Sequence, residues 1–276
     1  MYSFIKTMSQ SGNKYILRMT LINQLPQKVQ KELKKKSLLK VISGLDNFDM
    51  ESVKLIANAA LRGGADMIDL ACKPELVEEV QKVSYLPICV SSVEPKLFTD
   101  SVKAGAVLLE IGNFDSFYEK GITFSAEQII SLTKETKDLL PDIPLSVTVP
   151  HTLTLDKQVE LAIKLVKEGV DFIQTEGGKS TTPISSGVQG HFEKAVPTLS
   201  STFSISQEFA KNNINTPIMC ASGLSEITCP LAIASGASAV GVGSVVNKLD
   251  NLIAMIAAVR ALKESLDNSL IRQKIS

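Results

Sequence analysis

The chain of 276 residues is poor in the side chains that form disulfides and bind transition metals. It contains four cysteines and two histidines: Cys72, Cys89, Cys220, Cys229, His151 and His191. The cysteines show no Cys-x-x-Cys spacing, and three of them lie in or beside apolar strand-like segments, so we expect reduced thiols rather than a disulfide scaffold. Neither histidine has a partner at ligand spacing, and the sequence therefore predicts no metal site.

Long apolar segments and nucleotide-binding turns are also missing. No apolar stretch approaches the roughly 20 residues needed to cross a bilayer, so we predict no membrane partner. No Gly-x-Gly-x-x-Gly turn follows the first strand-like segment, which argues against an open doubly wound sheet. The segment Gly177-Gly178-Lys179-Ser180-Thr181 has Ile173 where a Walker loop needs its first glycine. We expect this segment to bind an anion through its backbone or to act as a mobile lid.

Eight short apolar segments rich in valine and isoleucine alternate with amphipathic helical patterns along the chain. They are Leu39–Gly44, Met67–Ala71, Ile88–Ser92, Val107–Gly112, Leu145–Val149, Phe172–Glu176, Ile218–Ser222 and Ala239–Gly243. Such an alternation is typical of a parallel sheet covered on both faces. Proline precedes the third, fifth and seventh segments and glycine the second, fourth, sixth and eighth, which suggests paired modules. We predict an α/β fold, the eight-fold (β/α) TIM barrel with a basic N-terminal helical extension.

The basic residues gather at the start of the chain. Lysine plus arginine equals aspartate plus glutamate, 29 against 29, yet Glu32 is the only acid within residues 1–40. We divide the chain into an extension (1–37), the barrel (38–268) and a tail (269–276), and interpret Lys31–Lys36 as the solvated face of a helix capping the barrel. For residues 1–18, disorder, a targeting segment and a mis-assigned start all stay open. The lysines have no interleaved aromatics, so we predict no nucleic-acid partner.

Two glycine turns near the C-terminus predict a phosphate site. In a barrel of this type, the loops after the seventh and eighth strands form the usual phosphate pocket. Here those loops carry Ser222-Gly223 and Gly241-Val242-Gly243-Ser244, and glycine lets a backbone approach an anion closely. The predicted phosphate-binding residues are Ser222, Gly223, Gly241, Gly243 and Ser244.

Polar residues at the C-terminal ends of the strands predict the reaction centre, because active sites of this fold lie there. The candidate catalytic residues are Glu176, Asp69, Lys73, Lys179 and His151. Glu176 is the first choice for an acid or base, with a loop-tethering salt bridge as the alternative. Three roles are open for Lys73: it pairs with a negative charge on the substrate, it forms a Schiff base, or it is a solvated side chain with no part in the reaction. Asp69 and Glu110 need buried cationic partners, and the candidates are Lys40, Lys73 and Lys179. The alternative for Lys40 is that it pairs with a carboxylate at the opposite end of the barrel, which serves stability.

Two loops after strands are long enough to act as lids or binding loops. They are residues 113–125, and residues 177 to about 197, a stretch rich in glycine, serine and threonine. Long loops in compact domains are usually functional, although a surface insertion is the alternative.

The segments Leu38–Phe48 and Gly63–Ala71 resemble the plastid and cyanobacterial family named for hypothetical chloroplast reading frame 23. The resemblance extends through Glu176-Gly177-Gly178 and Cys220–Leu224 and covers nearly all of the chain after about residue 30. It implies a TIM barrel located in the chloroplast stroma, or in the cytoplasm if the source is a cyanobacterium. The C-terminal glycine turns are also similar to those of phosphate-binding barrels, which include flavin-dependent oxidoreductases.

Two classes of function remain open from the sequence. The first is an enzyme that binds a small phosphorylated metabolite and catalyses proton transfer, isomerisation or carbon–carbon bond chemistry; a variant binds FMN as cofactor. The second is a non-catalytic phosphometabolite sensor or scaffold whose basic arm contacts a partner. An oligomer is compatible with both. We favour the enzyme because polar residues end several different strands.

Overall fold

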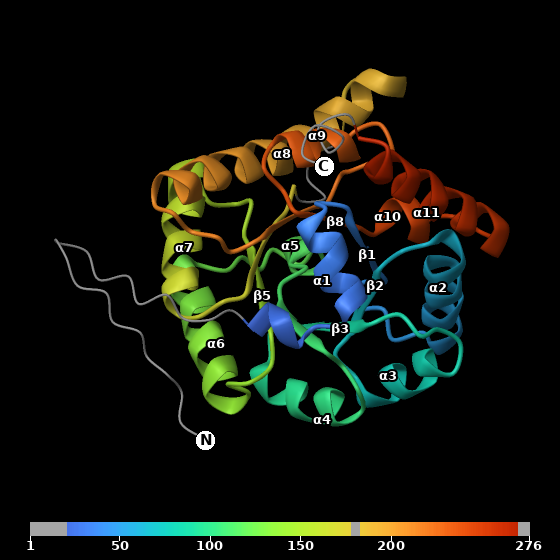
Figure 1. Cartoon of the computed structure of the whole chain (residues 1–276), viewed down its shortest axis with the longest axis horizontal. Coiled ribbons are helices and arrows are strands. Elements are labelled where there is room, and N and C mark those ends of the chain that lie inside the picture. The colour runs from blue at the N-terminus through green and yellow to red at the C-terminus, as the bar shows by residue number, and fades with distance from the viewer. Residues whose placement is uncertain (1–20, 178–182, 270–276) are drawn as a thin grey trace, which may run out of the picture.

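A closed barrel of eight parallel strands forms the centre of the protein (Figure 1). The computed structural model describes residues 21–177 and 183–269. The strands are β1 (Leu38–Ile42), β2 (Met67–Ala71), β3 (Ile88–Ser92), β4 (Leu108–Ile111), β5 (Leu145–Val149), β6 (Phe172–Thr175), β7 (Ile218–Ala221) and β8 (Ala239–Val242). Each pairs in parallel with its neighbours in sequence, and β8 closes on β1. The predicted barrel is confirmed, with five of the predicted segments ending one or two residues beyond the strand.

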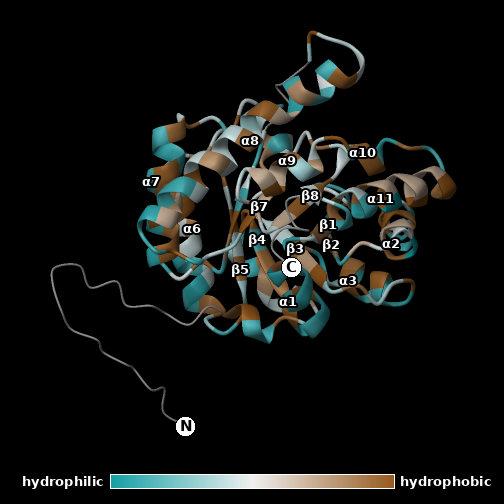
Figure 2. Cartoon of the chain, turned by 45° about the horizontal axis from the view of Figure 1, so that its top comes forward, coloured by the Kyte–Doolittle hydropathy of each residue, from teal (hydrophilic) through white to brown (hydrophobic). Residues whose placement is uncertain are grey.

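Helices surround the barrel, and at least one follows each of the eight strands. The longer ones are α2 (Met50–Gly63), α3 (Pro74–Gln81), α6 (Ala126–Leu139), α7 (Leu155–Lys167), α8 (Gly187–Lys211) and α11 (Leu252–Asp267). The shorter ones are η2 (Pro95–Leu97), α4 (Phe98–Lys103), α5 (Asp115–Tyr118), α9 (Cys229–Ala234) and α10 (Ser244–Asn247). Their inward faces pack on the outside of the strands, and the strands β4 and β5 are largely hydrophobic in Figure 2. Over the described residues, the helices include none with the length and apolar character to cross a membrane.

The loop predicted to run to about Pro197 is shorter than expected. Helix α8 begins at Gly187, and Pro197 lies inside it. Proline removes one helical hydrogen bond, but burial of Ala195, Thr198 and Ile205 holds the helix together through that position. Residues 178–182, including Lys179, lie outside the described part of the chain.

The basic N-terminal extension forms a cap over one end of the barrel. It consists of η1 (Leu21–Gln24) and α1 (Gln27–Lys34), and α1 lies across the barrel opening that faces the viewer in Figure 1. Leu25, Val29 and Leu33 pack on the lowest layer of inward side chains. That layer consists of Leu38, Met67, Cys89, Leu108, Phe172, Met219 and Ala239. The lower interior is therefore apolar and closed.

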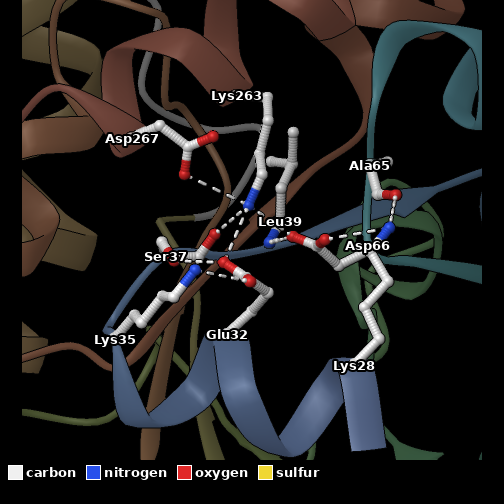
Figure 3. Close-up of polar contacts among 9 residues, drawn as sticks. All are labelled: Lys28, Glu32, Lys35, Ser37, Leu39, Ala65, Asp66, Lys263 and Asp267. Atoms are coloured by element: carbon white, nitrogen blue, oxygen red, sulfur yellow. Dashed lines mark hydrogen bonds and ion pairs between the residues drawn. The ribbon is translucent and has the colours of Figure 1, made fainter. Parts of the chain in front are cut away.

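A network of ion pairs fastens α1 to this end (Figure 3). Lys263 of α11 lies 2.8 Å from Asp66 Oδ2 and 3.4 Å from Glu32 Oε2 through its Nζ. Lys28 and Lys35 add further pairs with Asp66 and Glu32. We call Lys28, Glu32, Lys35, Asp66 and Lys263 the bottom cluster. It joins the extension, the start of β2 and the last helix.

Asp66 has a counterpart half a barrel away. Asp66 precedes β2 and accepts a hydrogen bond from Leu39 N at 3.0 Å, and Asp171 precedes β6 and accepts one from Leu145 N at 3.0 Å. Lys137 pairs with Asp171 at 2.8 Å, as Lys263 does with Asp66. Both aspartates follow a glycine that ends a helix, so the repeated punctuation in the sequence fixes repeated strand junctions.

Candidate functional site

The inward side chains change from apolar to polar toward the C-terminal ends of the strands. Successive residues of a strand point to opposite faces, so the residue two positions after each apolar layer member also faces inward. Leu38 is thus followed by Lys40, Met67 by Asp69, and Phe172 by Gln174. The polar inward set also includes Ser91, Glu110 and Thr148. This layer forms the floor of the candidate site.

Lys40 lies at the centre of the floor between two carboxylates. Its Nζ is 3.1 Å from Asp69 Oδ2 and 3.2 Å from Glu110 Oε2, and all three side chains are at most 1% exposed. We call Lys40, Asp69 and Glu110 the interior cluster. Lys40 is thus a partner of both carboxylates, as one reading of the sequence held; it does not lie at the stable end, because it is the middle residue of β1.

Burial affects the charges of the interior cluster in opposite ways. Burial lowers the pKa of Lys40, but the nearby Asp69 and Glu110 carboxylates outweigh it and raise that pKa. Burial raises the pKa of Glu110 and is only partly offset by the Lys40 charge. Lys40 is therefore cationic at neutral pH, and one lysine faces two carboxylates.

Hydrogen bonds extend from the two carboxylates to two carboxamides. Asp69 accepts from Ser91 Oγ at 2.6 Å and from Asn113 Nδ2 at 3.1 Å. Glu110 accepts from Thr148 Oγ1 at 2.6 Å. Gln174 Nε2 then donates to Asn113 Oδ1 at 3.3 Å and to Thr148 Oγ1 at 3.1 Å. These hydrogen bonds hold the side chains of Asn113 and Gln174 in one orientation.

Glu176, directly after β6, gathers a tyrosine and a histidine. Its Oε1 accepts from Tyr118 Oη at 2.5 Å and from His151 N at 3.0 Å, and it lies 3.0 Å from His151 Nδ1. The hydrogen bond to Glu176 raises the pKa of His151, and burial raises the pKa of Tyr118. We call Tyr118, His151 and Glu176 the acid–base group. A carboxylate that holds an imidazole in this way can store and release a proton near neutral pH.

The two glycine turns lie side by side on the same rim. Ala221 pairs with Gly241 in the barrel, so Gly223 and Gly243 follow at matched positions. Ser222 and Gly223 both have positive φ, at 71° and 72°, and a Cβ on Gly223 would lie 2.5 Å from Lys194 O. Among the hydrogen bonds of the described residues, none uses the main-chain N–H of Ser222, Gly223, Gly243 or Ser244. The rim therefore carries a group of unpaired amide donors.

The structure brings together only some of the candidate catalytic residues. Asp69 belongs to the interior cluster, whereas Glu176 and His151 belong to the acid–base group. Lys73 is exposed at the start of α3 and takes part in neither. Lys179 lies outside the described residues.

Three residues near the site were not selected from the sequence. Tyr118 belongs to a helix of four residues inside a long loop, so no periodicity marked it. Lys194, in the N-terminal third of α8, packs against Gly223. Asn247, on α10, donates to Ile42 O and Ser43 O at 2.8 and 3.1 Å. Asn247 could have been identified from the sequence by its position in the turn that follows the eighth strand.

The thiols are buried, and the described residues hold no metal-binding group. All four cysteines are free and buried, and burial raises the pKa of Cys72 to about 11. Thiols with raised pKa are poor nucleophiles at neutral pH. Groups of three or more metal-ligating side chains are absent from the part of the chain that the structure describes.

The fold and its site define a TIM barrel with charged and amide groups at the C-terminal strand ends. A family model described as "Protein of unknown function (DUF561)" matches residues 23–272. "Uncharacterized protein ycf23" of Cyanophora paradoxa is 44% identical over 247 residues, which cover 88% of this chain and 98% of that protein. The chain belongs to this family, as its resemblance to hypothetical chloroplast reading frame 23 implied.

Solved TIM-barrel enzymes share the fold at low sequence identity. Thiamine phosphate pyrophosphorylase from Pyrococcus furiosus superposes with a TM-score of 0.55 at 17% identity, covering 86% of this chain and 99% of that one. 3-Hexulose-6-phosphate synthase superposes with a TM-score of 0.56 at 14% identity, covering 83% and 99%. At such identities the likeness extends to the fold alone.

Proposed function

We propose that this protein is an enzyme that binds a small phosphorylated metabolite and transfers protons on it, in an isomerisation or a carbon–carbon bond reaction. The observation that carries the proposal is the pair of unpaired amide groups at Ser222-Gly223 and Gly243-Ser244, on the same rim as the acid–base group. Unpaired main-chain N–H groups are strong donors to phosphate oxygens. The names of the two structural neighbours also include phosphorylated compounds.

Glu176 is the proposed acid or base. It is nearly buried, with 5% of its side chain exposed, and its bonds to Tyr118 and His151 hold the carboxylate in one orientation. Asp69 is enclosed by Lys40, Ser91 and Asn113, which suits it to positioning rather than to proton transfer. Lys73 and Lys179 have no assigned role in this proposal. The ycf23 relative of Cyanophora paradoxa supports a plastid location, and within the plastid we propose the stroma.

The sensor hypothesis needs the basic arm to be free for a partner. Two of its lysines, Lys28 and Lys35, are instead paired with Asp66 and Glu32 of the same chain. The part of the arm that α1 forms thus serves to close the barrel. This use of its charges supports the enzyme over the sensor.

The first test asks whether the rim binds phosphate. Ser244 is exposed at the start of α10, where an aspartate suits the helix but repels an anion. We expect Ser244→Asp to weaken binding of inorganic phosphate at least about tenfold, whereas Ser244→Asn leaves it unchanged. Equal phosphate binding by both variants, measured by titration calorimetry, overturns the proposed phosphate site.

The second test asks whether Glu176 moves protons. Native mass spectrometry identifies the phosphorylated compound that co-purifies with the full chain, and absorbance identifies a bound flavin. We expect the wild type to convert this compound or to exchange its hydrogen for deuterium in D₂O. Glu176→Gln retains the compound but loses roughly 100-fold or more in rate, while exposed Glu51→Gln changes neither. An undiminished rate in Glu176→Gln contradicts the assignment.

A further inference from the structure

The outward face of helix α8 is hydrophobic. Four of its large apolar side chains are between 41 and 54% exposed: Val188, Phe192, Val196 and Phe203. Successive residues of a helix are about 100° apart, so these four side chains lie within an arc of about 80°. We call these four residues the α8 stripe. The neighbouring helix α7 instead carries an exposed ion pair, Lys157 with Glu160, as is usual for a helix that faces water.

The surface around the α8 stripe is formed by two segments of the chain that carry no charge. Residues 195–207 and 227–247 contain no aspartate, glutamate, lysine or arginine, although these residues make up 21% of the whole chain. The second segment includes α9, which packs beside α8, and its Ile227 and Leu231 are each 37% exposed. A partner that covers this surface is therefore recognised by apolar contact rather than by charge.

The N-terminal turns of α8 project beyond the other helices of the ring (Figures 1 and 2). The loop before them is held by Glu193, whose carboxylate accepts from Ile184 N at 2.8 Å, Ser185 N at 3.0 Å and Ser185 Oγ at 2.6 Å. These bonds fix the backbone of Ile184, although this residue is 99% exposed. An apolar residue held in water contributes no burial to the monomer, so the hydrophobic surface is pre-organised for contact with another molecule.

The exposed area of these residues matches the area that a dimer needs. The exposed parts of Ile184 and the α8 stripe together amount to about 500 Å² of apolar surface, with about 100 Å² from each phenylalanine. A standard interface buries about 800 Å² per partner, and about 65% of a homodimer interface is apolar, which corresponds to about 520 Å². Complete coverage of Ile184 and the α8 stripe therefore supplies the apolar part of one such interface.

We propose that the α8 stripe is the interface between two copies of this chain, related by a twofold axis. A twofold axis brings the same surface of both copies together, so an uncharged apolar stripe meets an equally apolar one. Val188, Phe192 and Val196 are spaced by four residues and form a ridge, and two such ridges interdigitate when the helices cross at about −50°. With Phe203, the contact extends about 22 Å along each helix. The proposal is independent of the phosphate site.

The test measures the mass of the full chain in solution by size-exclusion chromatography with light scattering. We expect the wild type at micromolar concentration to have about twice the chain mass of 29.8 kDa. Phe192→Glu places an unpaired carboxylate from each copy in the contact, and we expect it to weaken dimerisation at least about 100-fold and to give a monomer. The matched control is Tyr85→Glu, which changes an 85% exposed aromatic residue between α3 and β3 and should remain a dimer.

A chemical crosslink gives a second measurement that does not depend on disrupting the dimer. All four native cysteines are buried, so the new side chain of Val196→Cys is the exposed thiol of that variant. Val196 lies near the middle of the α8 stripe, where a twofold axis brings it close to Val196 of the second copy. We expect a short bifunctional maleimide to join two copies of Val196→Cys, whereas Tyr85→Cys stays a single chain on a denaturing gel.

Three results would overturn the proposal. A wild type that is monomeric throughout the micromolar range shows that a second copy does not cover the α8 stripe. A Phe192→Glu variant that remains dimeric shows that the dimer uses another surface. Species larger than a dimer contradict the closed twofold arrangement. Circular dichroism checks the folding of each variant, and the wild-type mass together with the Val196→Cys crosslink decides even if Phe192→Glu does not fold.

Discussion

The two ends of this barrel each hold a lysine between carboxylates, yet the surroundings differ. In the bottom cluster, Lys263 lies between Glu32 and Asp66, while Lys28 and Lys35 supply further positive charge at the surface. In the interior cluster, Lys40 alone faces Asp69 and Glu110 without solvent. Asp267 also pairs with Lys263, so three cations balance three carboxylates at the bottom, whereas the interior cluster has one cation for two carboxylates.

The pKa shifts reflect this difference. Burial would raise the pKa of Glu32, but the hydrogen bond from Ser37 and the charges of Lys263 and Lys35 lower it to about 2. At Glu110 the effect of burial is larger than that of the Lys40 charge, and the pKa of this carboxyl is therefore raised. The bottom cluster is therefore arranged for stability, whereas the interior cluster keeps an unfavourable charge balance that orients Asn113 and Gln174. Such an arrangement is typical of functional sites.

Removing the lysine of the interior cluster should have the largest effect. Lys40→Met leaves two buried carboxylates without a cation, and we expect it to lower the free energy of unfolding by about 3–5 kcal/mol. Urea denaturation measures the change, with the surface variant Lys54→Met as control. We expect the triple variant Lys40→Met/Asp69→Asn/Glu110→Gln to recover part of the loss, because no buried charge remains. A Lys40→Met variant as stable as the control would contradict this account of the interior cluster.

Removing the lysine of the bottom cluster should have a smaller effect. Lys263 is 13% exposed, and the carboxylates it leaves behind, Asp66 and Glu32, still pair with Lys28 and Lys35. We expect Lys263→Met to lower the free energy of unfolding by about 1–3 kcal/mol. Ligand binding should be unaffected, because the bottom cluster lies at the opposite end from the glycine turns. A loss of phosphate binding in a folded Lys263→Met protein would show that the two ends are coupled.

The features that the sequence predicted are those that depend on local residues. Short apolar segments located all eight strands, with glycine or proline before seven of them. Asp69, Glu110 and Glu176 were singled out as charged residues inside these segments or at their ends. The glycine turns were placed on one rim because they directly follow the seventh and eighth strands. These features depend on local residues alone. The fold and its candidate carboxylates were therefore accessible without a structure.

The missed features depend on contacts distant in sequence. Lys40 is the third residue of β1, and the sequence does not define the start of a strand to within one residue. The sequence therefore left undecided at which end of the barrel the Lys40 side chain lies. Tyr118 reaches Glu176 across 58 residues from a short loop helix. Pro197 indicated the end of a loop, but packing on the barrel kept α8 continuous. In each case tertiary contacts outweighed the local pattern.

The smallest predicted effect is a difference in pH response between the two ends. Glu32 has a folded pKa of about 2, below its ordinary value of 4.5, so its contribution to stability is complete above pH 4.5 and is lost as the pH falls toward 2. Glu110 has a raised pKa, so its contribution is present below its ordinary value and declines as the pH rises through the folded pKa. We expect the stability gap between wild type and Glu32→Gln to narrow by about 1 kcal/mol from pH 5 to pH 3. The stability of wild type relative to Glu110→Gln should instead increase over the same range. Urea denaturation of wild type and both variants at each pH measures how each stability difference changes with pH. If both differences change in the same direction, the pKa shifts of Glu32 and Glu110 are not opposite, and the contrast between the two clusters is wrong.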